Sequence, residues 1–432
     1  MSISRRRFLT LAGGAYAGVV LVGCGRGQGT VGPRSAAVEA AERRRRKPGA
    51  IVRDLTLTAA PFTLDLAGER AETWAYNGSI PGPELRVKAG EVIRARLMNG
   101  LPKPQSTVIH WHGLALRNDM DGVPGITQDA VPPGGSFLYE FAAPDPGTFW
   151  FHPHSGLQAD RGLYTALIVE DPAEPGRYDR EITIVLDDWT SGIGVEPEDT
   201  LKELKDGAMD MAHGGGGMRM AMSDALGGDA GDVTYPLFLM NGRPPKDPPT
   251  FQARPGERLR LRLVNAGADT AFRVALGGHR LTVTHTDGFA VEPATADSVL
   301  IGMSERYDVL VTVAGAGVFP LVAAAEGKGS QAFGILRSGA GDAPAPDVRV
   351  PELDGKLVQL TELRAAAAVT LPPRAPDRTH ILNLGAAKSG YQWTINGRAV
   401  TDDMKIAKQA KPIEVSEGER IRLVFDNGST MF

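Results

Sequence analysis

The clearest pattern in the sequence is the alternation of apolar and polar positions within short segments. From Arg258 to Asn265, leucines occupy every second position and arginines stand between them. A period of two with one apolar face is typical of a sandwich strand whose other face contacts water. We therefore predict a β-strand here, with its leucines in a core and its arginines in water.

This segment is one of three that repeat the same signals along the chain. Each copy has an Asn-Gly pair, then a Gly-Glu pair that begins a strand, and an asparagine nine residues after that second glycine. The Gly-Glu glycines are Gly90, Gly256 and Gly418, so the copies are 166 and 162 residues apart. A repeat of this length is a whole domain, and Asn-Gly is a turn signal between strands.

The repeat predicts an all-β protein built from tandem Greek-key β-sandwich domains. We expect the third domain to be incomplete, because the chain ends five residues after Asn427, where the third strand ends. The expected segments are an export signal at 1–24, a tether at 25–49, domain 1 at 50–172, domain 2 at 178–338, a linker rich in proline and alanine at 343–377, and the start of domain 3 at 378–432.

The N-terminal residues are typical of an export signal. Paired arginines precede an apolar stretch of 15 residues, Phe8–Val22, which is shorter than the roughly 20 residues of a membrane span. The arginines resemble a twin-arginine signal, and Leu21–Cys24 resembles a lipoprotein cleavage box. We expect an exported protein anchored to the outer face of the cytoplasmic membrane by a lipid on Cys24; a cleaved signal with an incidental cysteine is the alternative. The basic run Arg43–Lys47 is expected to be a solvated linker.

Composition excludes some classes of function. The chain is 42% hydrophobic and 23% charged, as is ordinary for a folded soluble protein. A net charge of −4 is too small to indicate a nucleic-acid partner, and no motif of that kind is present. The single cysteine excludes an intrachain disulfide.

Four of the eight histidines form two His-x-His pairs, His110–His112 and His152–His154. Residues two apart on a strand face the same side, so the imidazoles of one pair lie roughly 6–7 Å apart. This spacing suits two neighbouring metal ions, although imidazole alone fits zinc, copper, iron or nickel. Aromatic residues 149–151 are expected to keep water from the second pair, and Pro153 places that pair at a strand edge or bulge. Buried histidines bonded to the backbone are the alternative.

These motifs resemble those of multicopper oxidases. His110–Gly113 and Gly147–Ser155 are similar to the first two copper motifs of that family. Asn77–Pro83 resembles the family's entry to this region, and Glu305–Asp308 resembles its second-domain signature. The resemblance extends over residues 50–432 and is greatest to bacterial laccase-like and copper-resistance members.

The resemblance implies cupredoxin-like domains and a copper cluster. It assigns His110 to the type 2 copper, and His112, His152 and His154 to the type 3 pair. Asp121, 11 residues after His110, stands where relatives have an acidic residue that relays protons. A turn aspartate is the equal alternative for this position.

The resemblance also implies ligands that this sequence does not contain. In the family, the last domain supplies a His-Pro-x-His-x-His run and a His-Cys-His run, which complete the cluster and hold the type 1 copper. A type 1 site needs a thiolate, and Cys24 belongs to the export signal. We therefore expect a chain that stops before these motifs, lacks the type 1 site and is inactive alone. Three further histidines are expected to be structural: His279, His285 and His380.

Methionines crowd a glycine-rich stretch of domain 2. Thioethers are soft ligands that select Cu(I), and exposed methionines are hard to explain by packing. Similar loops occur in family members that oxidise cuprous ion, so we expect a Cu(I)-capturing loop; a disordered insert is the alternative. The loop contains Met209, Met211, His213, Met218, Met220 and Met222.

The resemblance implies an oxidase that takes single electrons from phenols, diamines or Cu(I) and reduces dioxygen to water. Its partners would be a small-molecule reductant or Cu(I) and dioxygen, with membrane contact only through the lipid. One alternative is a non-catalytic periplasmic scaffold or copper-binding protein of the same fold, although its ligands would be lost and here both pairs are intact. A zinc hydrolase would usually add a carboxylate base and helices between strands, and a two-domain nitrite reductase conflicts with the third repeat.

Overall fold

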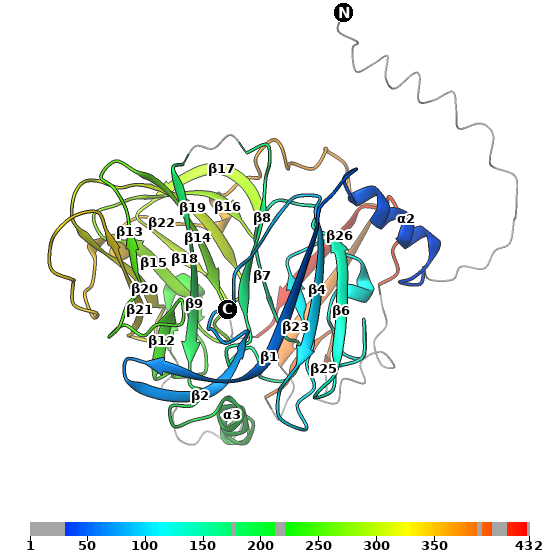
Figure 1. The fold of residues 1–432 in the computed structure, drawn as a ribbon, viewed down its shortest axis with the longest axis horizontal. Coiled ribbons are helices and arrows are strands. Elements are labelled where there is room, and N and C mark those ends of the chain that lie inside the picture. Colours follow the sequence, from blue (N-terminus) through cyan, green and yellow to red (C-terminus); the bar gives the residue numbers. More distant parts are fainter. Residues whose placement is uncertain (1–30, 175–177, 212–220, 387–390, 400–412, 430–432) are drawn as a thin grey trace, which may run out of the picture.

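The computed structural model describes residues 31–174, 178–211, 221–386, 391–399 and 413–429. Strands dominate these residues and pair into sheets in the order of the three repeats (Figure 1), which confirms the all-β prediction. The expected export signal and Cys24 lie outside the described residues. Within the described ranges, no helix has the length and apolar character needed to cross a membrane.

Domain 1 is a sandwich of two four-stranded sheets, ordered β2-β1-β4-β6 and β3-β8-β7-β5. Its core includes Ile93, Leu97 and Trp111, none of which is exposed. Its elements are β1 (Val52–Leu66), β2 (Glu69–Tyr76), β3 (Leu85–Lys88), β4 (Val92–Asn99), β5 (His110–His112), the 3-10 helix η1 (Asn118–Met120), β6 (Ser136–Ala142), β7 (Gly147–His152) and β8 (Thr165–Glu170).

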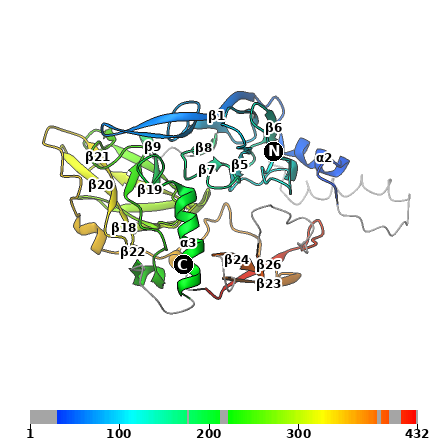
Figure 2. The same ribbon diagram turned by 90° about the horizontal axis from the view of Figure 1, so that it is seen from below.

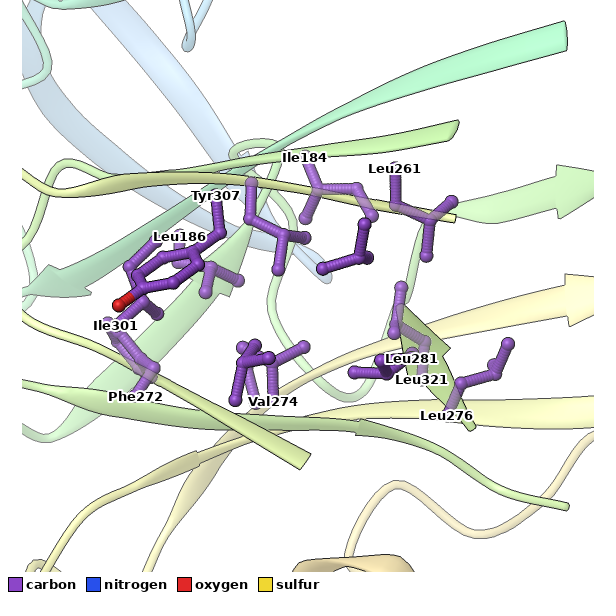
Figure 3. Packing of buried hydrophobic residues seen from close by; sticks show 14 of the residues in the cluster. Ile184, Leu186, Leu261, Phe272, Val274, Leu276, Leu281, Ile301, Tyr307 and Leu321 are labelled. Atoms are coloured by element: carbon purple, nitrogen blue, oxygen red, sulfur yellow. The ribbon is translucent and has the colours of Figure 1, made fainter. Parts of the chain in front are cut away.

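Domain 2 is a sandwich of two six-stranded sheets, ordered β12-β9-β14-β19-β16-β17 and β13-β21-β20-β15-β18-β22. Figure 3 shows Ile184 and Leu261 of the first sheet packed against Val274 and Leu321 of the second. Its strands are β9 (Arg180–Trp189), β12 (Leu237–Met240), β13 (Thr250–Gln252), β14 (Arg258–Asn265), β15 (Phe272–Leu276), β16 (Leu281–Thr286), β17 (Phe289–Ala296), β18 (Ser298–Ile301), β19 (Arg306–Thr312), β20 (Val318–Ala325), β21 (Gln331–Arg337) and β22 (Leu357–Val358). Between β9 and β12 lie α3 (Pro197–Met211), β10 (Met222–Ser223), η2 (Asp224–Leu226) and β11 (Gly228–Asp229).

The third repeat forms one sheet, ordered β25-β24-β23-β26, which lies apart from β1 and β6 in Figure 2. Its strands are β23 (Arg378–Ala386), β24 (Trp393–Ile395), β25 (Arg398–Ala399) and β26 (Ile421–Asn427). The expected linker at 343–377 is partly absorbed by domain 2, because Val350, Leu353 and Val358 are buried there and β22 pairs with β18. The short helices η3 (Pro351–Asp354) and η4 (Leu360–Glu362) flank β22.

The same two strands pair in each of the three repeats. The first strand of each domain runs parallel to the Gly-Glu strand, as β1 with β4, β9 with β14 and β23 with β26. Each Asn-Gly turn has its asparagine at φ 50–52°, which asparagine and glycine tolerate. The side-chain oxygen of that asparagine accepts a backbone N–H of the first strand, so the repeated residue ties each turn to its sheet. These bonds join Asn77 to Thr58, Asn241 to Val185 and Asn396 to Asn383.

The arginine face of β14 does not contact water as predicted. Arg258 is exposed, but Arg260 and Arg262 are only 3% and 2% exposed. Both pair with buried Asp308, at 2.5 and 3.2 Å, and Arg262 also donates to the Thr148 hydroxyl of domain 1 at 2.8 Å. Alternation predicted the strand and its two faces correctly, but domain 1 covers the second face.

Helix α2 (Ala36–Arg45) lies where a solvated tether was expected. It lies beside β6 of domain 1 (Figure 1). Glu42 is 3% exposed and accepts the N–H of Ala142 at 2.6 Å, and Arg46 pairs with Glu140 at 3.1 Å. The run of alanines favours helix formation, and the buried carboxylate attaches that helix to the sandwich.

Candidate metal centre

The two histidine pairs lie on neighbouring antiparallel strands. Strand β5 pairs with β7 so that His110 stands opposite His152 and His112 opposite Trp150. Because residues two apart on a strand share a face, the imidazoles gather on one side of this sheet. Strand β7 ends at His152, directly before Pro153, which has no N–H with which to continue the ladder.

The four imidazoles are close enough to share metal ions. Their ring centroids are 5.6 Å apart for His110 and His112, and 5.2 Å apart for His152 and His154. Across the strands, the ring of His110 lies 5.5 Å from that of His152 and 4.3 Å from that of His154. Ligand nitrogens of His110, His112 and His152 all lie within 4.8 Å of one another.

Hydrogen bonds select which nitrogen is free in the rings of His110 and His152. His110 Nδ1 lies 2.8 Å from the carbonyl oxygen of Asp121, and His152 Nδ1 lies 3.1 Å from that of Pro153. Because a carbonyl oxygen only accepts, each of these Nδ1 atoms carries the proton and leaves Nε2 with its lone pair. His112 Nδ1 lies 3.4 Å from His152 Nε2, so these two nitrogens are adjacent.

Burial favours the neutral form of three of the four imidazoles. Burial and, next, the positive charge of Arg306 lower the pKa of His112 to about 3. Burial followed by His110 lowers the pKa of His154 to about 4, and burial followed by His154 lowers the pKa of His152 well below its usual value. Neutral imidazole is the form that binds a metal, so these three rings are in the binding form at pH 7.

Only one of the three aromatic residues before His152 stacks on the imidazoles. The Trp150 ring lies 4.2 Å from that of His152, with 21° between the planes, and 5.2 Å from that of His112. Phe149 and Phe151 belong to the core of domain 1, because alternation along β7 turns them to the other face. The expectation that all three would surround the pair is therefore correct for Trp150 alone.

Asp121 lies beside His110 through its backbone and its side chain. It caps η1, where its N–H donates to the carbonyl of Asn118, as a turn aspartate would. Its carboxylate lies 3.4 Å from His110 Nδ1 and is 34% exposed. The position therefore has the turn geometry, and its partly exposed carboxylate lies beside the ring of His110.

Arg306 of domain 2 reaches the metal-site strands, which sequence reasoning missed. It is 4% exposed, and its Nε donates to the carbonyl of Thr148 at 3.2 Å. A Cβ added at Gly113, the residue after His112, would meet its Nη2 at 2.3 Å, and the φ of 86° at this position also favours glycine. The segment Glu305–Asp308 had been singled out by resemblance, and that is the signal by which this arginine could have been found.

The other predicted histidines lie elsewhere. Both ring nitrogens of His279 are used, by the carbonyl of Gly277 at 2.7 Å and the N–H of Ala314 at 3.0 Å. His285 contacts the Thr284 hydroxyl at 3.0 Å in domain 2, and His380 is on β23. The ring contacts of His279 and His285 lie within domain 2, whereas the structural role of His380 stays a prediction.

The structure describes few side chains of the predicted Cu(I) loop. Met209 and Met211 end helix α3, and their side chains are not described. His213, Met218 and Met220 lie outside the described residues. Met222, on β10, is 62% exposed, so the loop stays a prediction.

Comparisons with known proteins identify the family of this chain. Two family models described as multicopper oxidase match residues 59–174 and 180–340. The chain is 45% identical to "Multicopper oxidase MmcO" of Mycobacterium tuberculosis, over 99% of this chain and 83% of that protein. It is 35% identical to "Copper resistance protein A" of Pseudomonas syringae pv. tomato, over 60% of this chain and 45% of that protein. The chain thus matches less than half the length of the second relative.

Solved structures share the fold. A multi-copper oxidase from Pseudomonas thermotolerans superposes with a TM-score of 0.64 at 27% identity, covering 88% of this chain and 82% of that one. A laccase from Botrytis aclada superposes with a TM-score of 0.69 at 24% identity, covering 88% and 72%. Two family models match the chain, one relative aligns along almost all of it, and four histidines cluster in domain 1. The chain therefore belongs to the multicopper oxidase family of oxidoreductases.

Proposed function

We propose that this chain holds copper at four histidines, as its part of an oxidase that couples one-electron oxidation of phenols, diamines or Cu(I) to the reduction of dioxygen to water. One observation carries the proposal: the half-buried imidazoles of His110, His112 and His152 converge where β5 meets β7, with ligand nitrogens within 4.8 Å of one another. Family membership favours copper among the metals that imidazole binds.

The donor set fits copper. His112 Nδ1 and His152 Nε2 face each other at 3.4 Å, and the Nδ1 of His110 is engaged, which leaves its Nε2 for a metal. By the order of the family's motifs, we assign His110 to a type 2 copper and His112, His152 and His154 to a type 3 pair. Bound copper would supply the one-electron steps that reduce dioxygen.

The chain's own residues would orient the ligands and move protons. Trp150 stacks on His152 and fixes the ring plane. We propose that Asp121 relays protons between solvent and the site, since its partly exposed carboxylate lies 3.4 Å from His110 Nδ1 and a positioned carboxylate can serve as acid and base. Replacing Asp121 by Asn should keep copper bound and slow proton-dependent steps in an assembled enzyme.

Electron entry needs a further site. A type 1 copper requires a thiolate, and the single cysteine of these 432 residues is Cys24. We propose that the type 1 ligands are not among these residues. On this basis the chain alone binds copper but does not turn over a reductant.

The N-terminal pattern and the methionine stretch support two further parts of the proposal. We propose that the chain is exported and anchored through a lipid on Cys24, so a Cys24→Ala variant should leave the membrane fraction. We propose that the stretch from Met209 to Met222 captures Cu(I). Serine at its methionines should abolish Cu(I) retention there; unchanged cuprous oxidation in an assembled enzyme would refute the idea.

Copper titration of the 432-residue chain tests the central proposal. The copper-free protein is titrated with Cu(II) and with Zn(II), and bound metal is measured by elemental analysis and electron paramagnetic resonance. We expect His110→Ala and His152→Ala to lose copper, whereas His380→Ala, on β23, should bind as the unmodified protein does. Equal copper contents for all four proteins, or a preference for zinc, would overturn the proposal.

A further inference from the structure

Helix α2 lies outside the residues that the family models match, yet it is firmly attached to domain 1. Glu42 of the helix is buried and accepts the N–H of Ala142, in β6 at the edge of its sheet. Arg46, just past the helix, pairs with Glu140 of the same strand. A buried carboxylate that satisfies a backbone N–H is costly to displace, so these contacts fix the helix against the sandwich.

The same helix holds the loop that follows His112. Arg45 donates to the carbonyl of Ala115 at 2.7 Å, and Glu39 accepts from Arg117 at 2.8 Å. Arg117 also pairs with Asp119 at 2.6 Å, where Asp119 is 5% exposed. Residues 113–121 are therefore tied to α2 at two points, beyond their own turn bonds.

This loop ends at the group that orients His110. The carbonyl of Asp121 accepts the Nδ1–H of His110 at 2.8 Å. A Cβ added at Gly122 would lie 1.8 Å from the carbonyl oxygen of Ile109, so the end of the loop packs directly on the strand that carries His110. A shift of the loop would move the carbonyl that sets this tautomer and ring direction.

We propose that α2 is a clamp that positions His110 for metal binding, with Glu39, Glu42 and Arg45 as positioning residues. The inference rests on the proposed function, because it takes His110 as a copper ligand. Partners of a ligand's second nitrogen fix its orientation, and their loss typically lowers metal affinity about 10–100-fold. Here the partner is a loop carbonyl, and the clamp is what keeps that loop in place.

A charge-neutral double variant tests the clamp in the whole chain. Glu39→Gln with Arg45→Gln removes both ties to the loop. Glu69→Gln with Arg44→Gln makes the same chemical change at two exposed positions. Two quantities are measured: amide hydrogen exchange of residues 113–121 in the copper-free protein, and the Kd for Cu(II). Exchange in β14 shows whether either variant disturbs the rest of the fold.

We expect the Glu39/Arg45 variant to speed exchange in the loop about tenfold, because local opening becomes easier. Its Kd should rise about tenfold, whereas the control should match the unmodified protein in both. Arg45→Lys, which keeps a donor for the carbonyl of Ala115, should restore most of the affinity in a protein that retains Glu39.

Two results would overturn the clamp: loop exchange equal to that of the control, or faster exchange with an unchanged Kd. Failure of the proposed function looks different. In that case the unmodified chain and His110→Ala bind Cu(II) equally weakly, and no role in positioning a ligand survives, although the exchange experiment still shows whether α2 holds the loop.

Discussion

The hydroxyl of Thr148 donates a 2.6 Å hydrogen bond to the carboxylate of Asp308, which joins β7 of domain 1 to β19 of domain 2. Burial alone would raise the pKa of Asp308, but the guanidinium groups of Arg262 and Arg260 hold the pKa below its usual range. The strand that carries His152 is therefore fixed from behind by a buried ionic network. Domain 2 supplies none of the four clustered histidines, yet it supports the strand on which two of them depend.

Replacing Asp308 by Asn should destabilise the protein strongly. It removes the buried charge that Arg260 and Arg262 share, each at most 3% exposed, and leaves them only the more exposed Glu174 and Glu181. Removing one partner of a buried ion pair costs about 3–5 kcal/mol, and we expect a loss near the lower value. Urea denaturation at pH 7 measures the change. Asp297→Asn is the control, because its partner Arg280 is 59% exposed and surface pairs contribute about 1 kcal/mol or less. Equal urea midpoints for both variants would contradict a stabilising network.

Two replacements of Trp150 should distinguish the effect of its stacking on copper affinity from the effect of its packing on stability. Alanine removes the ring that stacks on His152 and leaves a cavity, so we expect a loss of about 3–5 kcal/mol and a Cu(II) affinity lower by about tenfold. Phenylalanine keeps a ring at this position, so both losses should be less than half as large. Calorimetric titration with Cu(II) and thermal unfolding measure them. Identical affinities for the two variants would show that stacking does not orient the imidazole.

Stability should fall as pH rises, in part because of Asp160. Burial, followed by the charge of Asp188, raises the pKa of Asp160 to about 7, whereas an unfolded aspartate titrates near 4. The folded state holds the proton more tightly, so this contribution is complete below about pH 4 and is lost as pH rises through about 7. Asp160→Asn cannot ionise, and its urea midpoint should fall less between pH 5 and pH 8. An equal fall in both proteins would exclude Asp160 as a cause.

Replacing Gly147 by Ala should disturb the domain interface. Its Cβ would lie 2.3 Å from the carbonyl oxygen of Gly288 in domain 2, and such overpacking costs about 1–3 kcal/mol. Gly315→Ala is the control, because nothing lies within 4 Å of its added Cβ, and its effect should stay within about 0.5 kcal/mol. Chemical denaturation distinguishes the two. A Gly147 variant as stable as the control would mean that the backbones of Gly147 and Gly288 can move apart at little cost in free energy.

Local patterns predicted most of what lies within single strands. The period of two placed His110 and His112 on one face, and the Asn-Gly pairs marked turns at which asparagine adopts positive φ. Both features are set by residues that are close together in the sequence, so a local pattern can predict them. The pairing of β5 with β7, which brings the second histidine pair opposite the first, is a non-local choice that no such pattern encodes.

Contacts between domains were the part that sequence could not supply. Alternation in β14 separates two faces but does not say what covers each, so Arg260 was expected in water and is buried. Arg306 reaches Gly113 across the domain interface, and no pattern within a single strand predicts that contact. Helix α2 was interpreted as a tether because its charges are typical of a solvated segment, while its attachment depends on Glu42 meeting a free N–H at a sheet edge.

The asparagines at the Asn-Gly turns also bear on how the protein ages. Asparagine before glycine deamidates readily, because the glycine nitrogen reaches the side-chain carbonyl, and asparagine is among the thermolabile residues. In Asn77 and Asn241 the side-chain amide also donates to the carbonyls of Thr56 and Thr183, at 2.9 and 3.0 Å. Aspartate would keep the acceptor but set a negative charge against a carbonyl oxygen. The chemical lifetime of the first two domains is thus linked to the residue that forms each turn.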